Sequence, residues 1–100
     1  MIRLTAAEIA AILGGELHGD PGAAVTGSVQ TDSRRVGRGD LFFALRGETA
    51  DGARFAPAAA EAGAALVVAE RPLELPIPLV LVPDALAALA ALAREAVARV

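Results

Sequence analysis

Cysteine and lysine are both absent from this 100-residue sequence, and each absence excludes a class of site. Without cysteine, the chain forms no disulfide and holds no metal ion through thiolates. All nine basic residues are arginine, so the chain also lacks the lysine of the phosphate-binding loop pattern GxxxxGK(S/T). The chain therefore does not hydrolyse ATP through a P-loop of its own.

Histidine, clustered positive charge and long apolar runs are scarce as well. His18 is the only histidine, and a single histidine at a strand end is typical of a surface or packing residue rather than a metal ligand. The net charge is -3 and the arginines are scattered, which argues against nucleic-acid binding. No apolar run approaches the roughly 20 residues that cross a bilayer. Glu8 interrupts the apolar N-terminal run, unlike a signal peptide, so we expect a cytoplasmic protein without a membrane contact.

The length suits one small domain, which we place at residues 1–100. Hydrophobic residues make up 55% of the chain, but many are alanine, so the buried apolar area is modest. We expect the chain to be a monomer.

The hydrophobic spacing predicts alternating helices and strands. Thr5 and Glu8 match a capping box before a helix over residues 6–13, and Gly14 with Gly15 ends it. The remaining expected elements are strands at 16–18, 24–30, 41–45, 65–69 and 79–82 and helices at 55–62 and 85–100. On the last helix, one stripe is predicted to face the sheet: Leu86, Leu89, Leu92, Ala93 and Val97.

This order predicts an α/β fold: a small three-layer domain with a mixed, mostly parallel sheet of about five strands flanked by helices. Residues 41–45 are apolar on both faces, as expected for a central strand. The strand, helix and strand from residue 41 to residue 69 form a right-handed parallel crossover.

Two polar loops lie next to the predicted central strand. Thr31 and the triplet Asp32-Ser33-Arg34 precede it, and residues 46–52 follow it. A hydroxyl, a guanidinium and glycine-permitted main-chain N–H groups suit a phosphorylated or nucleotide-like ligand at a strand end. The same residues also suit ordinary surface turns, in which Asp32 and Asp51 cap the backbone and the arginines are solvated. The pattern leaves both interpretations open.

The motifs DSR at residues 32–34, GDLFFALRGE at 39–48 and DG at 51–52 occur in that order, with Phe55 and the triplet at 62–64 behind them. This pattern resembles the N-terminal domain of the Mur ligases, which build the peptide of the bacterial cell-wall precursor. The resemblance extends over essentially the whole chain. Within the family, the opening LT…IA…LGG…LHG and the ending VPDALAAL are similar to the members that add D-alanyl-D-alanine to UDP-N-acetylmuramoyl-tripeptide.

The resemblance implies that this domain holds the uridine diphosphate end of the substrate. The positions that match nucleotide contacts in the family, together with their neighbours, are Thr31, Ser33, Arg34, Arg46, Glu48, Thr49, Ala50 and Asp51. Members that add the third residue often carry His-Gln where this chain has Glu48-Thr49, a change that backbone contacts to the nucleotide would survive. No catalytic and no metal-binding residue is expected in this domain.

The resemblance further implies that ATP and Mg2+ act in a central domain, and that D-alanyl-D-alanine binds a third domain, both outside these 100 residues. We expect no cofactor in this domain and UDP-N-acetylmuramoyl-tripeptide as its partner. Two alternatives stay open: the same domain of the ligase that adds the third, diamino-acid residue, and a non-catalytic interaction module with this fold.

Overall fold

A five-stranded sheet forms the centre of the computed structural model, which describes residues 3–45 and 52–98. The strand order is β2-β7-β6-β5-β4. Their bounds are β2 Glu16–His18, β7 Leu79–Leu81, β6 Leu66–Ala69, β5 Leu41–Phe43 and β4 Val29–Gln30. Strands β4, β5, β6 and β7 run parallel to one another, whereas β2 runs antiparallel to β7. The predicted mixed, mostly parallel sheet is confirmed.

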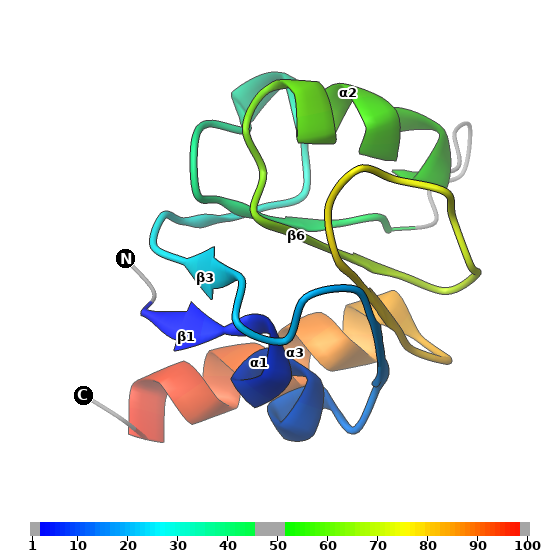
Figure 1. Ribbon diagram of the computed structural model, residues 1–100. Coiled ribbons are helices and arrows are strands. Elements are labelled where there is room, and N and C mark those ends of the chain that lie inside the picture. The colour runs from blue at the N-terminus through cyan, green and yellow to red at the C-terminus, as the bar shows by residue number, and fades with distance from the viewer. Residues whose placement is uncertain (1–2, 46–51, 99–100) are drawn as a thin grey trace.

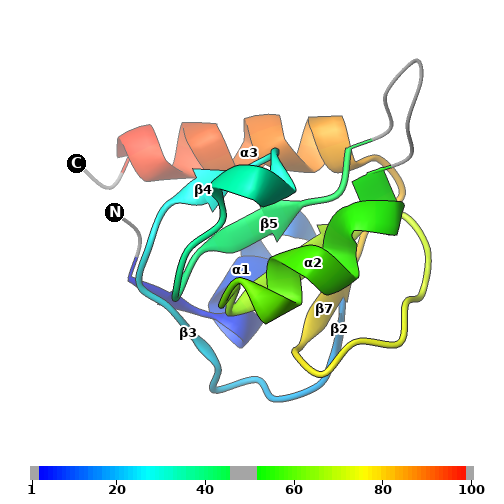
Figure 2. The same ribbon diagram turned by 90° about the horizontal axis from the view of Figure 1, so that it is seen from above.

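Helices cover both faces of this sheet. Helix α2 (Ala56–Glu61) lies on one face, and α1 (Ala6–Leu13) and α3 (Ala85–Ala98) lie on the other (Figures 1 and 2). Side chains alternate along β5, so Leu41 and Phe43 belong to the core with α1 and α3, while Phe42 belongs to the core with α2. A strand that is buried on both faces explains why its sequence is apolar without interruption.

Helix α1 begins and ends where its sequence predicts. The main-chain N–H of Glu8 donates to the Thr5 hydroxyl (3.2 Å), and the N–H of Thr5 donates to the Glu8 carboxylate (3.0 Å). Gly14 ends the helix with a φ of 65°, a left-handed conformation that glycine adopts without strain. The capping box and the glycine stop are both confirmed.

The single strand predicted over residues 24–30 is wrong, because the segment divides between two sheets. Strand β3 (Ala24–Val25) pairs with β1 (Leu4–Thr5) in a separate two-stranded sheet, while β4 joins the main sheet. Between them, the N–H groups of Thr26 and Gly27 both donate to the carbonyl of Gly39, at 3.1 and 3.0 Å. Because these N–H groups bond to a turn that is distant in the sequence, the backbone does not continue as one strand from β3 into β4.

Asp40 fixes the same turn from inside the protein. Asp40 is only 8% exposed, and its carboxylate accepts from the N–H of Ser28 (2.7 Å) and from the N–H of Gly37 (2.8 Å). A buried carboxylate is tolerated when such donors satisfy it. Asp40 therefore joins the segment before β4 to the turn before β5.

The stripe predicted for α3 is confirmed only in part. Leu92 is buried and Leu89 is half-buried, but Leu86 is 65% exposed and Ala93 is exposed as well. The side chain of Val97 lies outside the described residues.

The start of α3 explains this difference. The N–H of Ala85 donates to the Glu70 carboxylate (2.9 Å), and Ala85 is fully buried. Since Ala85 faces the sheet, the next residue, Leu86, is turned about 100° away from it. Asp84 accepts from the N–H of Ala87 (3.1 Å) and caps the helix as predicted. Within the described residues, no helix is both long and apolar enough to cross a membrane.

Candidate functional site

A pocket of about 540 Å³ lies near the carboxyl ends of β4 and β5. Ligands of open α/β sheets bind at this edge, beyond the strand ends. The residues that line the pocket are Thr31, Asp32, Ser33, Arg34, Phe42, Gly52 and Phe55. Three predicted nucleotide-contacting residues are therefore together in one pocket: Thr31, Ser33 and Arg34.

A short 3-10 helix, η1 (Ser33–Arg35), carries the polar wall of this pocket. Asp32 is its N-cap, because its carboxylate accepts from the N–H of Arg34 at 3.0 Å. The N–H of Arg35 donates to the Asp32 carbonyl at 3.0 Å. Ser33 is thus held half-buried, in a turn that local hydrogen bonds define.

The side chains of Asp32 and Arg34 form an ion pair in the pocket wall. The guanidinium donates to the carboxylate twice, from Nε at 3.1 Å and from Nη2 at 3.0 Å. The Arg34 side chain is nevertheless 88% exposed. The hydrogen bond from the Arg34 side chain, aided by its main-chain N–H, lowers the pKa of Asp32, and the carboxylate in turn raises the pKa of Arg34. The turn interpretation is correct for Asp32, and it coexists with the pocket.

Two aromatic residues complete the pocket, and the sequence interpretation did not include either in the site. Phe42 is 1% exposed and Phe55 is 44% exposed. The sequence holds only three phenylalanines and no other aromatic residue, so two of its three aromatic rings line one pocket. The scarcity of aromatic residues, together with the position of Phe55 just after the second polar loop, was the sequence signal that could have placed Phe55 in the site.

Five of the predicted site residues lie outside the described residues: Arg46, Glu48, Thr49, Ala50 and Asp51. On either side of them, the N–H of Gly52 donates to the carbonyl of Leu45 at 2.9 Å. Gly52 therefore lies next to the residue that closely follows β5, and Gly52 itself lines the pocket.

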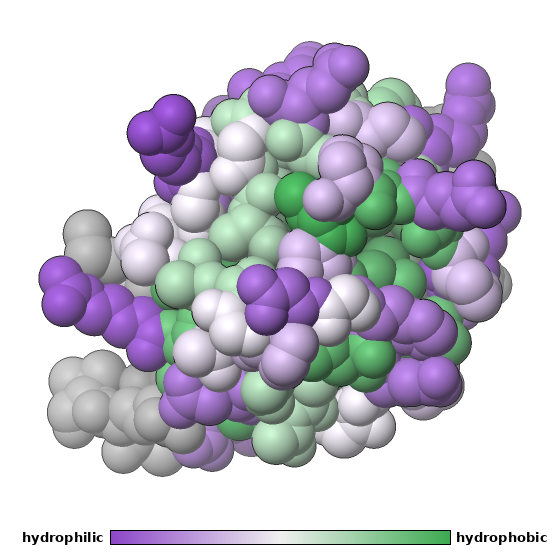
Figure 3. All heavy atoms as spheres, in the orientation of Figure 1, coloured by the Kyte–Doolittle hydropathy of each residue, from purple (hydrophilic) through white to green (hydrophobic). Residues whose placement is uncertain are grey.

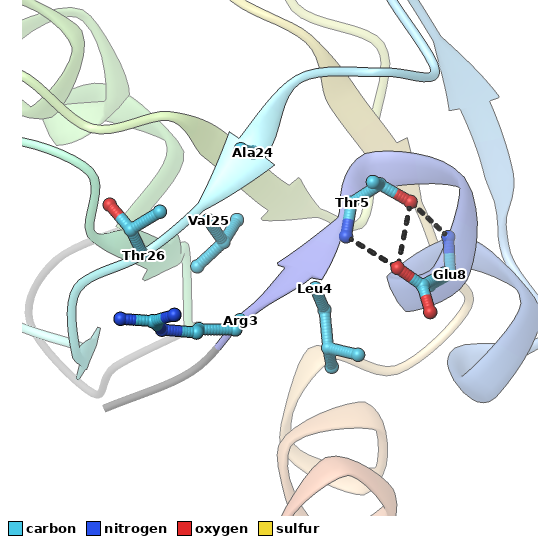
Figure 4. Close-up of a pocket in the computed structure, with 7 residues that line it drawn as sticks. All are labelled: Arg3, Leu4, Thr5, Glu8, Ala24, Val25 and Thr26. Carbon is cyan, nitrogen blue, oxygen red and sulfur yellow. Dashed lines mark hydrogen bonds between the residues drawn. The ribbon is translucent and has the colours of Figure 1, made fainter.

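Another pocket, of about 480 Å³, lies beside the small sheet of β1 and β3 (Figure 4). Its polar groups include Thr5 and Glu8, whose hydrogen bonds to each other form the cap of α1. Arg3 and Thr26 lie near one another at its other end (Figure 4). Helix capping accounts for half of these polar groups.

A third pocket, of about 470 Å³, lies between the end of β2 and the loop that leads to β7. Its lining is largely apolar and includes Leu73, Leu75 and Ile77. Figure 3 shows that hydrophobic residues are also exposed among hydrophilic residues on one face of the molecule. His18, also in this lining, is 3.2 Å from the Glu16 carboxylate on the exposed surface, in keeping with a surface role. Among these pockets, the one beside η1 combines hydroxyl, guanidinium and aromatic groups.

Comparison with known proteins identifies the family. Residues 25–96 match the family described as "Mur ligase family, catalytic domain". The chain belongs to the Mur ligase family. The resemblance seen in the sequence motifs is thereby confirmed.

Relatives within the Mur ligase family include two kinds of enzyme. The chain is 47% identical, over 95 residues, to the UDP-N-acetylmuramoyl-tripeptide--D-alanyl-D-alanine ligase of Mycobacterium bovis, a match that covers 87% of this chain and 19% of that enzyme. It is 53% identical, over 66 residues, to the UDP-N-acetylmuramoyl-L-alanyl-D-glutamate--2,6-diaminopimelate ligase of Geobacillus kaustophilus, covering 66% of this chain and 14% of that enzyme.

The fold of this Mur ligase domain also matches a solved structure. MurF from Acinetobacter baumannii superposes with a TM-score of 0.81 and 29% sequence identity, over 91% of this chain and 20% of that one. The chain thus spans a fifth or less of the length of these relatives.

Proposed function

We propose that this chain is the substrate-recognition domain of an ATP-dependent ligase that adds D-alanyl-D-alanine to UDP-N-acetylmuramoyl-tripeptide. The observation that carries the proposal is the pocket in which Thr31, Ser33 and Arg34 meet at the carboxyl edge of the sheet. Arg34 offers charge-assisted hydrogen bonds to a diphosphate, and Ser33 offers a hydroxyl. The relatives' names include a UDP-linked substrate, which is the kind of ligand that such a pocket suits.

The domain's role is anchoring rather than chemistry. ATP and Mg2+, bound elsewhere in the enzyme, would convert the tripeptide carboxylate to an acyl phosphate, which D-alanyl-D-alanine then attacks. This domain would hold the remote UDP end, so that binding energy far from the reacting carbon positions the carboxylate. By itself, the domain has no ligase activity.

The D-alanyl-D-alanine-adding member is favoured over the diamino-acid-adding member by the extent of the match. The tripeptide ligase aligns with 87% of this chain and the diaminopimelate ligase with 66%, although the shorter match has the higher identity. The higher identity keeps the diamino-acid ligase as the second candidate. Measuring whether an enzyme with this domain consumes D-alanyl-D-alanine or a diamino acid separates the two.

An NMR titration tests the anchoring role. When UDP-N-acetylmuramoyl-tripeptide is added to the 15N-labelled chain, we expect amide shifts at Thr31, Ser33 and Arg34 and at residues 48–50. The double variant Ser33→Ala with Arg34→Ala should weaken binding by about tenfold or more, because charge-assisted hydrogen bonds are lost. Arg38→Ala is the matched control, since Arg38 is also exposed but lies before β5, at the opposite edge of the sheet. Absence of shifts in the pocket would refute the proposal.

A further inference from the structure

Phe55 stands out among the residues of the site pocket because this large apolar side chain is more exposed than the small alanines near it in the sequence. Its neighbours Ala53 and Ala56 are 7% and 0% exposed, whereas the much larger Phe55 is 44% exposed. The turn η2 (Gly52–Phe55) thus directs small side chains into the core and the aromatic ring toward the pocket. A single exposed apolar residue is ordinary, but this one lines a pocket that Ser33 and Arg34 line as well.

The backbone that carries Phe55 is held close to the end of β5. Besides the hydrogen bond from Gly52 to Leu45, the two backbones approach so closely that a Cβ atom at Gly52 would lie 2.7 Å from the main-chain nitrogen of Leu45. Phe55 itself is the N-cap residue of α2. A ring at the start of a helix, three residues after a glycine that is hydrogen-bonded to Leu45, is well placed to orient a ligand.

The polar and the aromatic residues that line the pocket suit the two ends of a nucleotide. The polar wall, with Ser33 and Arg34, suits phosphate oxygens. The aromatic wall, with Phe42 and Phe55, suits a flat base, because bases stack on aromatic side chains through their π faces. Since Phe42 is almost fully buried, Phe55 presents the accessible aromatic surface of this wall.

We propose that Phe55 is the stacking surface for the pyrimidine base of the bound nucleotide, an inference that rests on the proposed function. Phe55 is then a specificity-determining residue that favours a nucleoside diphosphate over a diphosphate without a base. Arg34 binds the charged part of the same ligand.

Tryptophan fluorescence provides a direct test, because the sequence contains neither tryptophan nor tyrosine. In the variant Phe55→Trp, the introduced indole is the only such fluorophore. We expect UDP to quench its emission, because the base stacks on the indole, and inorganic pyrophosphate at the same concentration to leave it unchanged. Leu86→Trp is the matched control: Leu86 is 65% exposed but lines a different hollow, so neither ligand should quench the emission of that variant.

Affinity for UDP gives a second measurement. Phe55→Ala should weaken binding by about 5- to 100-fold, Phe55→Leu should restore only part of it, and Phe55→Tyr should stay within about threefold of the unaltered chain. The amide spectrum of each variant shows whether it is folded. If Phe55→Ala does not fold, the comparison of Phe55→Leu with Phe55→Tyr still tests the inference.

The outcomes separate this inference from the proposed function. If UDP shifts the amides of Ser33 and Arg34 but Phe55→Ala binds as well as the unaltered chain, and Phe55→Trp is not quenched, the stacking inference is wrong and the anchoring role stands. If UDP shifts no amide in the pocket, the anchoring role fails and the stacking inference fails with it.

Discussion

A phosphate bound in the pocket, as we propose, would meet an arginine that is already paired. Arg34 donates both main-chain and side-chain hydrogen bonds to Asp32, only two residues away. Exposed ion pairs of this kind contribute little to stability, so Arg34 is available to a stronger anionic partner at small cost. The Asp32 carboxylate holds the Arg34 guanidinium beside the pocket.

The titration of Asp32 reports on this pair. The pKa of Asp32 lies below its ordinary value of 3.8, chiefly because of the hydrogen bond from the Arg34 side chain. A lowered folded-state pKa means that the stabilising effect is complete above the unfolded-state value and is lost as the pH falls through the lower folded-state value. We expect the NMR titration of the Asp32 carboxyl carbon to have its midpoint below 3.8.

Arg34→Ala should raise that midpoint toward 3.8, although the main-chain N–H still donates to the carboxylate. Arg38→Ala should leave the midpoint where it is, because Arg38 is not among the groups that shift this carboxyl. A midpoint that is indifferent to Arg34→Ala would show that the ion pair does not form in solution.

Asp40 is a second residue whose side chain defines the backbone, here before β4 and β5, at the opposite ends of the strands from the site. Asp40→Asn keeps one oxygen acceptor but places an NH2 group against a main-chain N–H, so one of the donors from Ser28 and Gly37 loses its partner. We expect the free energy of unfolding to fall by about 1–3 kcal/mol in urea denaturation. Glu61→Gln, at an exposed position of α2, should change it by less than about 0.5 kcal/mol. Equal effects of the two substitutions would contradict the role given to Asp40.

At the scale of the element, α3 contains a matched pair of leucines with opposite surroundings. Leu92 is 2% exposed in the core against the sheet, and Leu86 is 65% exposed in the first turn. Leu92→Ala should lower the free energy of unfolding by about 2–5 kcal/mol, because it removes buried methyl groups and leaves a cavity. Leu86→Ala should change it by less than about 0.5 kcal/mol. Similar losses for both variants would mean that Leu86 is also buried in solution.

Elements whose ends are set by neighbouring residues were predictable from the sequence. The capping box of Thr5 and Glu8 and the left-handed Gly14 are all within α1 or next to it, so local rules sufficed for that helix. The division of residues 24–30 into β3 and β4 was not predictable, because it depends on bonds to Gly39 and Asp40, more than ten residues away. The outward orientation of Leu86 likewise depends on a distant residue, because the N–H of the preceding Ala85 donates to the carboxylate of Glu70.

The site followed the same rule. Thr31, Ser33 and Arg34 were predicted because they follow a strand and belong to a family motif. Phe55 was missed because the local pattern assigns it to the start of a helix, and its exposure follows only from which neighbours the folded turn buries. A residue that contributes through its place in the tertiary structure leaves only a compositional signal, here the scarcity of aromatic residues.

At the scale of the whole molecule, three layers place the pocket at one edge of the sheet. Helices cover both faces of the sheet, so the strand ends are where main-chain groups and loop side chains remain accessible (Figures 1 and 2). The stacking and phosphate contacts that we propose for this pocket would involve only the nucleotide end of a UDP-linked substrate. We expect the peptide end to extend beyond the residues that this domain supplies.

The affinities of the chain for different ligands test whether this domain binds only the nucleotide end of the substrate. If only the UDP end is bound, then UDP, UDP-N-acetylmuramoyl-tripeptide and UDP-N-acetylmuramoyl-dipeptide should have dissociation constants within about threefold of one another, since equal contacts give equal binding free energies. N-acetylmuramoyl-tripeptide without the nucleotide should not compete with UDP. Isothermal titration calorimetry on the chain measures all four ligands under one set of conditions. A tripeptide ligand that binds more than about tenfold tighter than UDP would show that this domain also contacts the peptide. These 100 residues would then contribute to substrate selectivity between the two kinds of ligase.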